Sequence, residues 1–181
     1  VESARLLIAA GANPNDALAD GMSALTLAAY NGQASTAVAL LELGANPNGA
    51  TIGFTALHAA ILRADSNKSL SPGLNALIEK TYKGSATALD LVKALLAHGA
   101  DPNARMTKGT PLRRQTADYN LLANRIGSTP YLLAAELPEV DTMRVLASAG
   151  ADVTMAMPDG STALMLAAGT SAGDNRNRRG V

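Results

Sequence analysis

Hydrophobic residues recur along the chain at helical spacing, in short groups that are each followed by a glycine. Residues three or four positions apart lie on one face of a helix, so each group predicts a short amphipathic helix. The following glycine is able to adopt positive φ and so ends the helix. The groups are Leu6 and Leu7; Val38 and Leu41; Leu91, Val92, Leu95 and Leu96; and Val140, Met143 and Leu146, followed by Gly11, Gly44, Gly99 and Gly150.

A second pattern places Ser or Thr directly before a short apolar segment that contains a pair of alanines. A Ser or Thr side chain caps the first turn of a helix, so this pattern predicts a second set of short helices. The small alanine side chains allow a neighbouring unit to approach closely. The openings are Ser23-Ala24-Leu25, Thr55-Ala56-Leu57, Thr129-Pro130-Tyr131 and Thr162-Ala163-Leu164, with alanine pairs at 28–29, 59–60, 134–135 and 167–168.

The two patterns alternate with a period near 33 residues. The distance from Ser23 to Gly44 is 21 positions, and that from Thr129 to Gly150 is again 21. A competing opening at Thr110 has no alanine pair after it, so Thr129 is the preferred start of its unit. The regular spacing predicts a chain built from repeated helix pairs.

Two insertions interrupt this period. About 23 additional residues lie between the two helices of one unit, at 64–87, and about 18 lie between units, at 104–126. Within the first insertion, Ser66–Gly73 is expected to be a loop and Leu74–Lys80 a further two helical turns.

A period of 33 residues with the segment Thr55-Ala56-Leu57-His58-Ala59-Ala60 resembles the ankyrin repeat, and the resemblance covers nearly the whole chain. It implies an all-α solenoid of stacked helix–turn–helix units joined by hairpin-like loops. The apolar faces of the units are then buried by stacking. We expect a single domain over 1–181, with units at 1–16 (partial), 17–49, 50–103, 104–153 and 154–181 (partial). Neither end has an obvious polar cap, so we expect a fragment of a longer array or of a multidomain protein. The alternative is a divergent capping tail.

The same resemblance places partner-binding residues at the inter-repeat loop tips and on the exposed face of each first helix, which together form a concave groove. Several are apolar and predict a hydrophobic patch there. The alternative is that the insertions fold back and cover them. The groove residues are Met22, Tyr30, Asn31, Ile52, Phe54, Ile61, Leu62, Ile126, Glu136, Leu137 and Asp159.

The insertion at 104–126 is basic and predicts a finger loop that contacts a partner with an acidic patch. Loops of this length are uncommon unless they are functional or disordered. The alternative is a solvated loop that packs on neighbouring units. The finger residues are Arg105, Lys108, Arg113, Arg114, Tyr119 and Arg125.

Composition argues against several other functions. The chain has no Cys and two His, so a thiolate zinc site and a catalytic thiol are excluded. The resemblance implies that His58 hydrogen-bonds the backbone and the Thr of its own motif. Fifteen basic and fifteen acidic residues give zero net charge, so we expect neither nucleic-acid nor membrane binding. We also expect no cofactor and no metal.

The sequence therefore predicts a non-catalytic protein-interaction module that binds another protein through the groove and the finger. The alternative is a structural or regulatory segment packed against neighbouring domains of a larger polypeptide. Covered side chains at Tyr30, Phe54 and Ile61 would remove the basis for an open groove. The sequence indicates neither the compartment nor the oligomeric state.

Overall fold

The computed structural model describes residues 1–68, 86–108 and 125–169, and within these ranges the regular structure is entirely helical. This confirms the predicted all-α fold class. The helices are α1 (Glu2–Ala9), α2 (Ala24–Tyr30), α3 (Ala34–Glu42), α4 (Ala56–Lys68), α6 (Ala88–Ala97), α8 (Pro130–Glu136), α9 (Val140–Ser148) and α10 (Ala163–Ala167).

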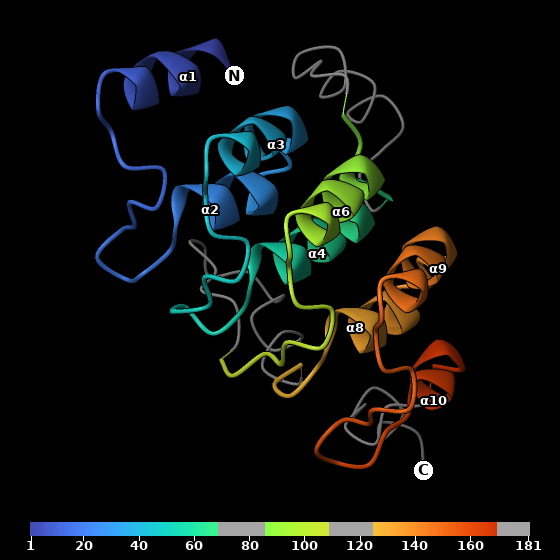
Figure 1. Cartoon of the computed structure of the whole chain (residues 1–181). Coiled ribbons are helices and arrows are strands. Elements are labelled where there is room, and N and C mark those ends of the chain that lie inside the picture. Colours follow the sequence, from blue (N-terminus) through green and yellow to red (C-terminus); the bar gives the residue numbers. More distant parts are fainter. Residues whose placement is uncertain (69–85, 109–124, 170–181) are drawn as a thin grey trace.

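The helices form two layers that run the length of a stack (Figure 1). The first layer contains α2, α4, α8 and α10, and the second layer contains α1, α3, α6 and α9. Each second-layer helix of a complete unit packs on the first-layer helix before it, as α3 on α2, α6 on α4 and α9 on α8. Consecutive helices of one layer also touch, so each unit contacts its neighbours in both layers. The helix pairs are those of a solenoid, as the repeat predicted.

The first-layer helices begin where the Ser and Thr residues predicted. The Ser23 hydroxyl accepts a hydrogen bond from the Thr26 amide at 3.2 Å, and the Thr129 hydroxyl accepts one from the Leu132 amide at 3.3 Å. These bonds satisfy amides that have no partner within the helix. Because α8 starts at Pro130 with Thr129 as its cap, the predicted opening at Thr129 is confirmed. The competing opening at Thr110 lies outside the described residues.

The second-layer helices end two residues before a glycine in the left-handed region. Gly11, Gly44, Gly99 and Gly150 have φ of 100°, 91°, 84° and 88°. A side chain at this φ would crowd the backbone, so the recurring glycine has a conformational cause.

The helix α4 is longer than expected. It continues to Lys68, so Ser66–Lys68 is helical and the predicted loop there is wrong at these residues. No proline or glycine interrupts the helix before that point, and each added residue extends the hydrogen-bonded turn at little cost. The predicted turns at Leu74–Lys80 lie outside the described residues.

Alanine and leucine fill the space between the layers. Ala59 and Ala134 from the alanine pairs are fully buried, as are Leu57, Leu95 and Leu133. They belong to one hydrophobic cluster that runs through the stack. Small side chains let adjacent helices approach closely, which explains a core with so few aromatic residues.

Asparagine side chains join consecutive units along the edge where the second-layer helices end. Asn48 Nδ2 donates to the Gly99 carbonyl at 2.8 Å, and Asn48 Oδ1 accepts from the Asp101 amide at 2.8 Å. Asn15 and Asn103 make the same pair of bonds to the unit that follows each. We call these contacts the asparagine bridges. Thr154 stands at the equivalent position after Asp152, so the series ends there.

Candidate protein-binding surface

The predicted apolar groove is part of the core. Six of the eleven groove residues are at most 9% exposed, so they offer no surface to a partner. All six belong to the hydrophobic cluster. The expectation of a solvent-exposed apolar patch is therefore corrected at Met22, Ile52, Phe54, Ile61, Leu62 and Leu137.

Phe54 shows why these positions are buried. It precedes the cap of α4, and its ring lies against that of Tyr30 at the end of α2, with centroids 6.4 Å apart and planes at 45°. This contact joins one unit to the next, and Tyr30 is half-buried as a result. A large apolar side chain is more stable in such a junction than in water.

Four further predicted groove residues are exposed or half-buried. Asn31 is exposed at the end of α2 and lines a cleft between α1 and α2. Ile126 and Asp159 are exposed at loop tips, and Glu136 is half-buried on α8.

The loops between units are hairpins that share a two-bond base. The Leu18 amide donates to the Met22 carbonyl at 2.9 Å, and the Gly21 amide donates to the Leu18 carbonyl at 2.8 Å. The equivalent bonds in the last hairpin join Met157 to Ser161 and Gly160 to Met157. In both hairpins, two residues form the tip between the bonded position and the glycine.

The finger grows from the tip of one such hairpin. The Met106 amide donates to the Ser128 carbonyl at 2.9 Å, and the Gly127 amide donates to the Met106 carbonyl at 2.7 Å, so the base is unchanged. Twenty residues, 107–126, stand where the other hairpins have two. The insertion therefore adds eighteen residues to a tip and leaves the helical stack in register.

The charges at the finger's base are partly used within the chain. Arg125 forms a two-point ion pair with Glu136, which joins a predicted finger residue to a predicted groove residue. Arg105 donates to the carbonyls of Gly127 at 2.7 Å and Ala156 at 3.0 Å, so it holds two loops together. The expectation of a partner-directed cation is corrected at Arg125, which is paired and half-buried, whereas Arg105 is exposed and keeps its charge. Lys108 is exposed.

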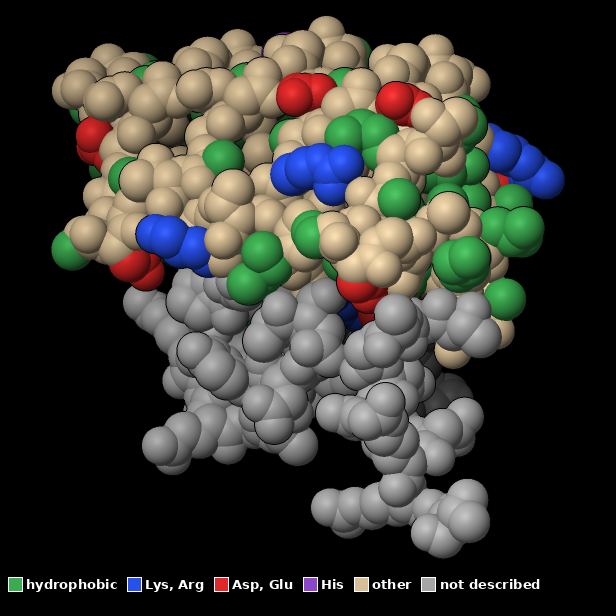
Figure 2. All heavy atoms as spheres, turned by 90° about the horizontal axis from the view of Figure 1, so that it is seen from below, with side chains coloured by type: hydrophobic (Ala, Val, Ile, Leu, Met, Phe, Trp, Pro, Cys, Tyr) green, Lys and Arg blue, Asp and Glu red, His purple; other side chains and the backbone are tan. Residues whose placement is uncertain are grey.

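The remaining finger residues, Arg113, Arg114 and Tyr119, lie outside the described residues. Figure 2 shows basic, acidic and hydrophobic side chains interspersed on the described part of one face. The described part of that face shows no extended patch of one charge.

The hairpin tips pack against one another in a row. A Cβ atom added to Gly21 would lie 2.6 Å from Thr51 of the next hairpin, and one on Gly127 would overlap Pro158. The tips therefore lie side by side, so close that neither glycine has room for a side chain. We call the exposed residues of this edge the hairpin-tip row: Leu18, Asp20, Thr51, Lys108, Ile126, Pro158 and Asp159.

Leu18 was not among the sequence-predicted residues. It is 44% exposed, and Ile126 is 46% exposed, so two large apolar side chains stand in the row. The signal was present, because Leu18-Ala19-Asp20-Gly21 matches Met157-Pro158-Asp159-Gly160 and Asp-Gly is a hairpin-tip sequence.

His58 has a structural role. Its Nδ1 accepts from the Thr55 amide at 3.3 Å and lies 2.9 Å from the Thr55 hydroxyl, and its Nε2 lies 3.3 Å from the Ser128 carbonyl of the next unit. The side chain is fully buried. Burial lowers the pKa of His58 from 6.5 to about 4, against the smaller opposing effect of the Ser128 hydrogen bond. The neutral ring therefore contacts the Thr of its own motif and a backbone carbonyl, as the resemblance implied, and the carbonyl contact also joins two units.

The part of the chain that the structure describes has no group of three or more His, Cys, Asp or Glu side chains placed to hold a metal ion. Among the same residues, no helix is both long enough and apolar enough to span a membrane.

A comparison with protein families supports the repeat architecture. A family model described as ankyrin repeats (3 copies) matches residues 1–106, which is more than half of the 181-residue chain.

Proposed function

Because this chain belongs to the ankyrin-repeat family, whose members are generally protein-binding modules, we propose that it is a non-catalytic module that binds another protein through the hairpin-tip row and the finger. The observation that carries the proposal is the eighteen-residue extension of one tip on an unchanged two-bond base. An extension of this length on a rigid scaffold adds contact surface without disturbing the stack.

Exposed apolar side chains in the row support the same surface. Leu18 and Ile126 remain exposed although most other large apolar residues of the described chain are buried or half-buried. Apolar side chains surrounded by polar ones are typical of the centre of a protein interface. The row also includes Asp20 and Asp159, whose carboxylates accept bonds from the amides of Met22 and Ser161 and so stiffen their tips.

The partner's chemistry follows from the finger. Arg105 bonds to carbonyl oxygens and not to a carboxylate, so its positive charge is not neutralised, and Lys108 is exposed beside it. With Arg113 and Arg114 in the sequence of the finger, these residues favour a partner that carries acidic side chains where the finger touches it.

Excising residues 107–124 tests the proposal. The deletion joins Met106 to Arg125-Ile126-Gly127 and so leaves a two-residue tip of the ordinary kind. We expect the variant to unfold as cooperatively as the wild type, because the base bonds and the ion pair of Arg125 with Glu136 remain. Proteins that the immobilised wild type retains from an extract of the source cells should be lost.

A matched control changes the opposite layer. Lys93 and Arg144 are exposed on α6 and α9, so Lys93→Glu with Arg144→Glu alters charge without touching the row. This control should retain the same proteins as the wild type. Retention of an identical set by the deletion variant would contradict the role of the finger.

A further inference from the structure

One of the three asparagine bridges is followed directly by a glycine. Asn48 precedes Gly49, whereas the other two bridge asparagines precede Asp16 and Ala104. A main-chain amide nitrogen attacks the side-chain carbonyl carbon of a preceding asparagine most readily when it belongs to glycine, because no side chain crowds the approach. The sequence therefore places a reactive pair of residues at a junction between two units.

The attacking nitrogen of this pair, that of Gly49, is free. In the three equivalent turns, the amide at this position donates to the carbonyl three residues earlier. These bonds join Asp16 to Asn13 at 3.1 Å, Ala104 to Asp101 at 3.4 Å and Met155 to Asp152 at 3.4 Å. Within the part of the chain that the structure describes, the Gly49 amide donates no hydrogen bond. No bond has to break at this nitrogen before it reacts.

The side chain that it would attack is held by the next unit. Asn48 Nδ2 donates to the Gly99 carbonyl and Asn48 Oδ1 accepts from the Asp101 amide, both at 2.8 Å. For the reaction, the side-chain carbon Cγ of Asn48 must turn onto the Gly49 nitrogen. Both bonds of the bridge have to break for that turn, so the closed bridge opposes the reaction.

We propose that Asn48 is a site of spontaneous deamidation that is controlled by the junction between the unit of α3 and the unit of α6. When the bridge opens, the Gly49 nitrogen bonds to Asn48 Cγ, and Nδ2 leaves as ammonia with the proton that the Gly49 nitrogen gives up. Water then opens the resulting succinimide ring. Attack of water at Cγ leaves an ordinary aspartate, and attack at the main-chain carbonyl carbon leaves an isoaspartate, whose main chain runs through Cβ.

Either product disables the bridge. A carboxylate at neutral pH has no proton to donate, so it meets the Gly99 carbonyl as a second acceptor in place of the Nδ2 donor. The junction then opens more readily than it did before the conversion. Closing the junction does not restore the amide, because the ammonia has been lost. This inference is independent of the hairpin-tip row and the finger.

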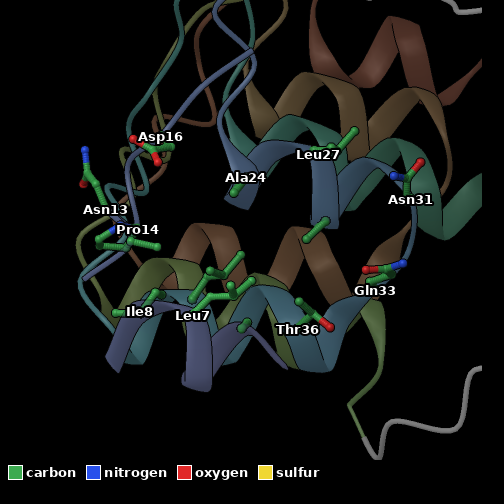
Figure 3. A pocket seen from close by; sticks show the side chains of 14 residues that line it. Leu7, Ile8, Asn13, Pro14, Asp16, Ala24, Leu27, Asn31, Gln33 and Thr36 are labelled. Atoms are coloured by element: carbon green, nitrogen blue, oxygen red, sulfur yellow. The ribbon is translucent and has the colours of Figure 1, made fainter. Parts of the chain in front are cut away.

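Peptide mapping by mass spectrometry tests the proposal on residues 1–181 incubated at mildly alkaline pH, which favours loss of the amide proton. Asn31, at the end of α2 beside the cleft that this helix forms with α1 (Figure 3), is the other asparagine that precedes a glycine. In guanidinium chloride, Asn31 and Asn48 should convert at similar rates. In buffer, conversion at Asn48 should be slower by roughly tenfold or more, because two hydrogen bonds must break first. Equal rates at Asn48 in buffer and in denaturant would overturn the proposal.

A double variant separates the bridge from the turn that carries it. Asp152 Oδ1 accepts from the Thr154 amide at 2.9 Å, as Asn46 Oδ1 does from the Asn48 amide, so the two turns are alike. Position 154 makes no bridge among the described residues. With Thr154→Asn and Met155→Gly, conversion at position 154 should be nearly as fast in buffer as in denaturant. Conversion there as slow as at Asn48 would show that the turn and not the bridge protects the amide.

Gly49→Ala tests the attacking group. Gly49 does not have positive φ, and an added Cβ would meet only the Asn46 carbonyl oxygen at 3.8 Å, so the variant should fold with wild-type stability. Conversion at Asn48 should nearly stop, in buffer and in denaturant alike. Conversion at the wild-type rate would rule out attack by the nitrogen of residue 49.

The effect of the product on the junction is measured with Asn48→Asp. This variant should lower the urea midpoint of unfolding. Asn31→Asp is the matched control, because it adds the same charge at an exposed side chain that makes no hydrogen bond among the described residues, and it should shift the midpoint less. Equal shifts would contradict a role of the bridge. Partner capture after excision of 107–124 is measured separately, so failure of one proposal leaves the other standing.

Discussion

Arg125 and Glu136 form a two-point ion pair, with Arg125 Nε 2.9 Å from Glu136 Oε2 and Arg125 Nη2 3.2 Å from Glu136 Oε1. The pair joins the last part of the finger to α8, and the two side chains are 14% and 32% exposed. Because the two hydrogen bonds run in parallel, they fix the orientation of both side chains. The finger's return to the stack is therefore anchored at one charged contact.

Breaking this pair should lower the free energy of unfolding. We expect either Arg125→Gln or Glu136→Gln to lower the free energy of unfolding, measured in urea, by about 1 kcal/mol. The double-mutant cycle should give a coupling energy of similar size. Arg144 and Asp141 form the matched control, because that pair is 75% and 74% exposed. Arg144→Gln should change stability by less than half as much. Equal effects at the two pairs would contradict the anchoring role of Arg125.

Acidification should destabilise the fold through His58. The pKa of His58 is about 4 in the folded chain, against its ordinary value of 6.5. Between pH 4 and pH 6.5 the unfolded chain therefore binds the proton more readily than the folded chain does. The stability from the neutral ring is fully present above pH 6.5 and is lost as the pH falls toward 4. The full loss is roughly 3 kcal/mol by the conversion of pKa difference to free energy.

Urea midpoints measured at half-unit steps between pH 7 and pH 4 would show this dependence. His58→Gln should be less stable at pH 7 but should show a flatter profile over this window. His98, which is exposed at the end of α6, provides the control, and His98→Gln should keep the wild-type profile. The profile below pH 4 includes Asp90, Asp152 and Asp159, whose pKa values are lowered by hydrogen bonds, and is not part of the comparison.

Removing one asparagine bridge should weaken the junction between two units. Asn48→Ala deletes one donor and one acceptor that meet Gly99 and Asp101 at 2.8 Å. We expect a loss of about 1–2 kcal/mol in the free energy of unfolding, at roughly 1 kcal/mol or less for each exposed bond. Thr154→Ala, at the position without a bridge, should cost less. Equal losses would show that the bridges add little beyond a local turn.

The close approach of hairpin tips is tested by two glycines with the same backbone conformation. Gly127 and Gly150 both have φ of 88°, but a Cβ on Gly127 overlaps Pro158, whereas one on Gly150 meets nothing within 4 Å. Gly150→Ala should lower the free energy of unfolding by about 1–2 kcal/mol, because alanine is strained in the left-handed conformation. Gly127→Ala should cost about 1–3 kcal/mol more, because the next hairpin must move. Thermal and urea unfolding of the two variants measure the difference.

The wrong groove assignment has a specific cause. Phe54 and Ile61 occupy variable positions of the repeat, so sequence comparison of the units marked them as free for binding. In the stack, Phe54 instead meets Tyr30 of the preceding unit, and Ile61 joins the core cluster. Variability between units does not distinguish a surface position from a junction position, because adjacent junctions in this chain are filled by different side chains.

Residue order alone determined the repeat, the starts of the first-layer helices, the ends of the second-layer helices and the place of the finger. These features depend on local chemistry: a Ser or Thr cap, a glycine that adopts positive φ, and apolar residues at helical spacing. Only the tertiary structure decided which side chains are exposed. Exposure of Leu7 and burial of Leu40 depend on whether another helix lies alongside, and the bond from Arg125 to Glu136 depends on two segments meeting in space. Local sequence encodes the units, but burial and charge pairing arise from the contacts between them.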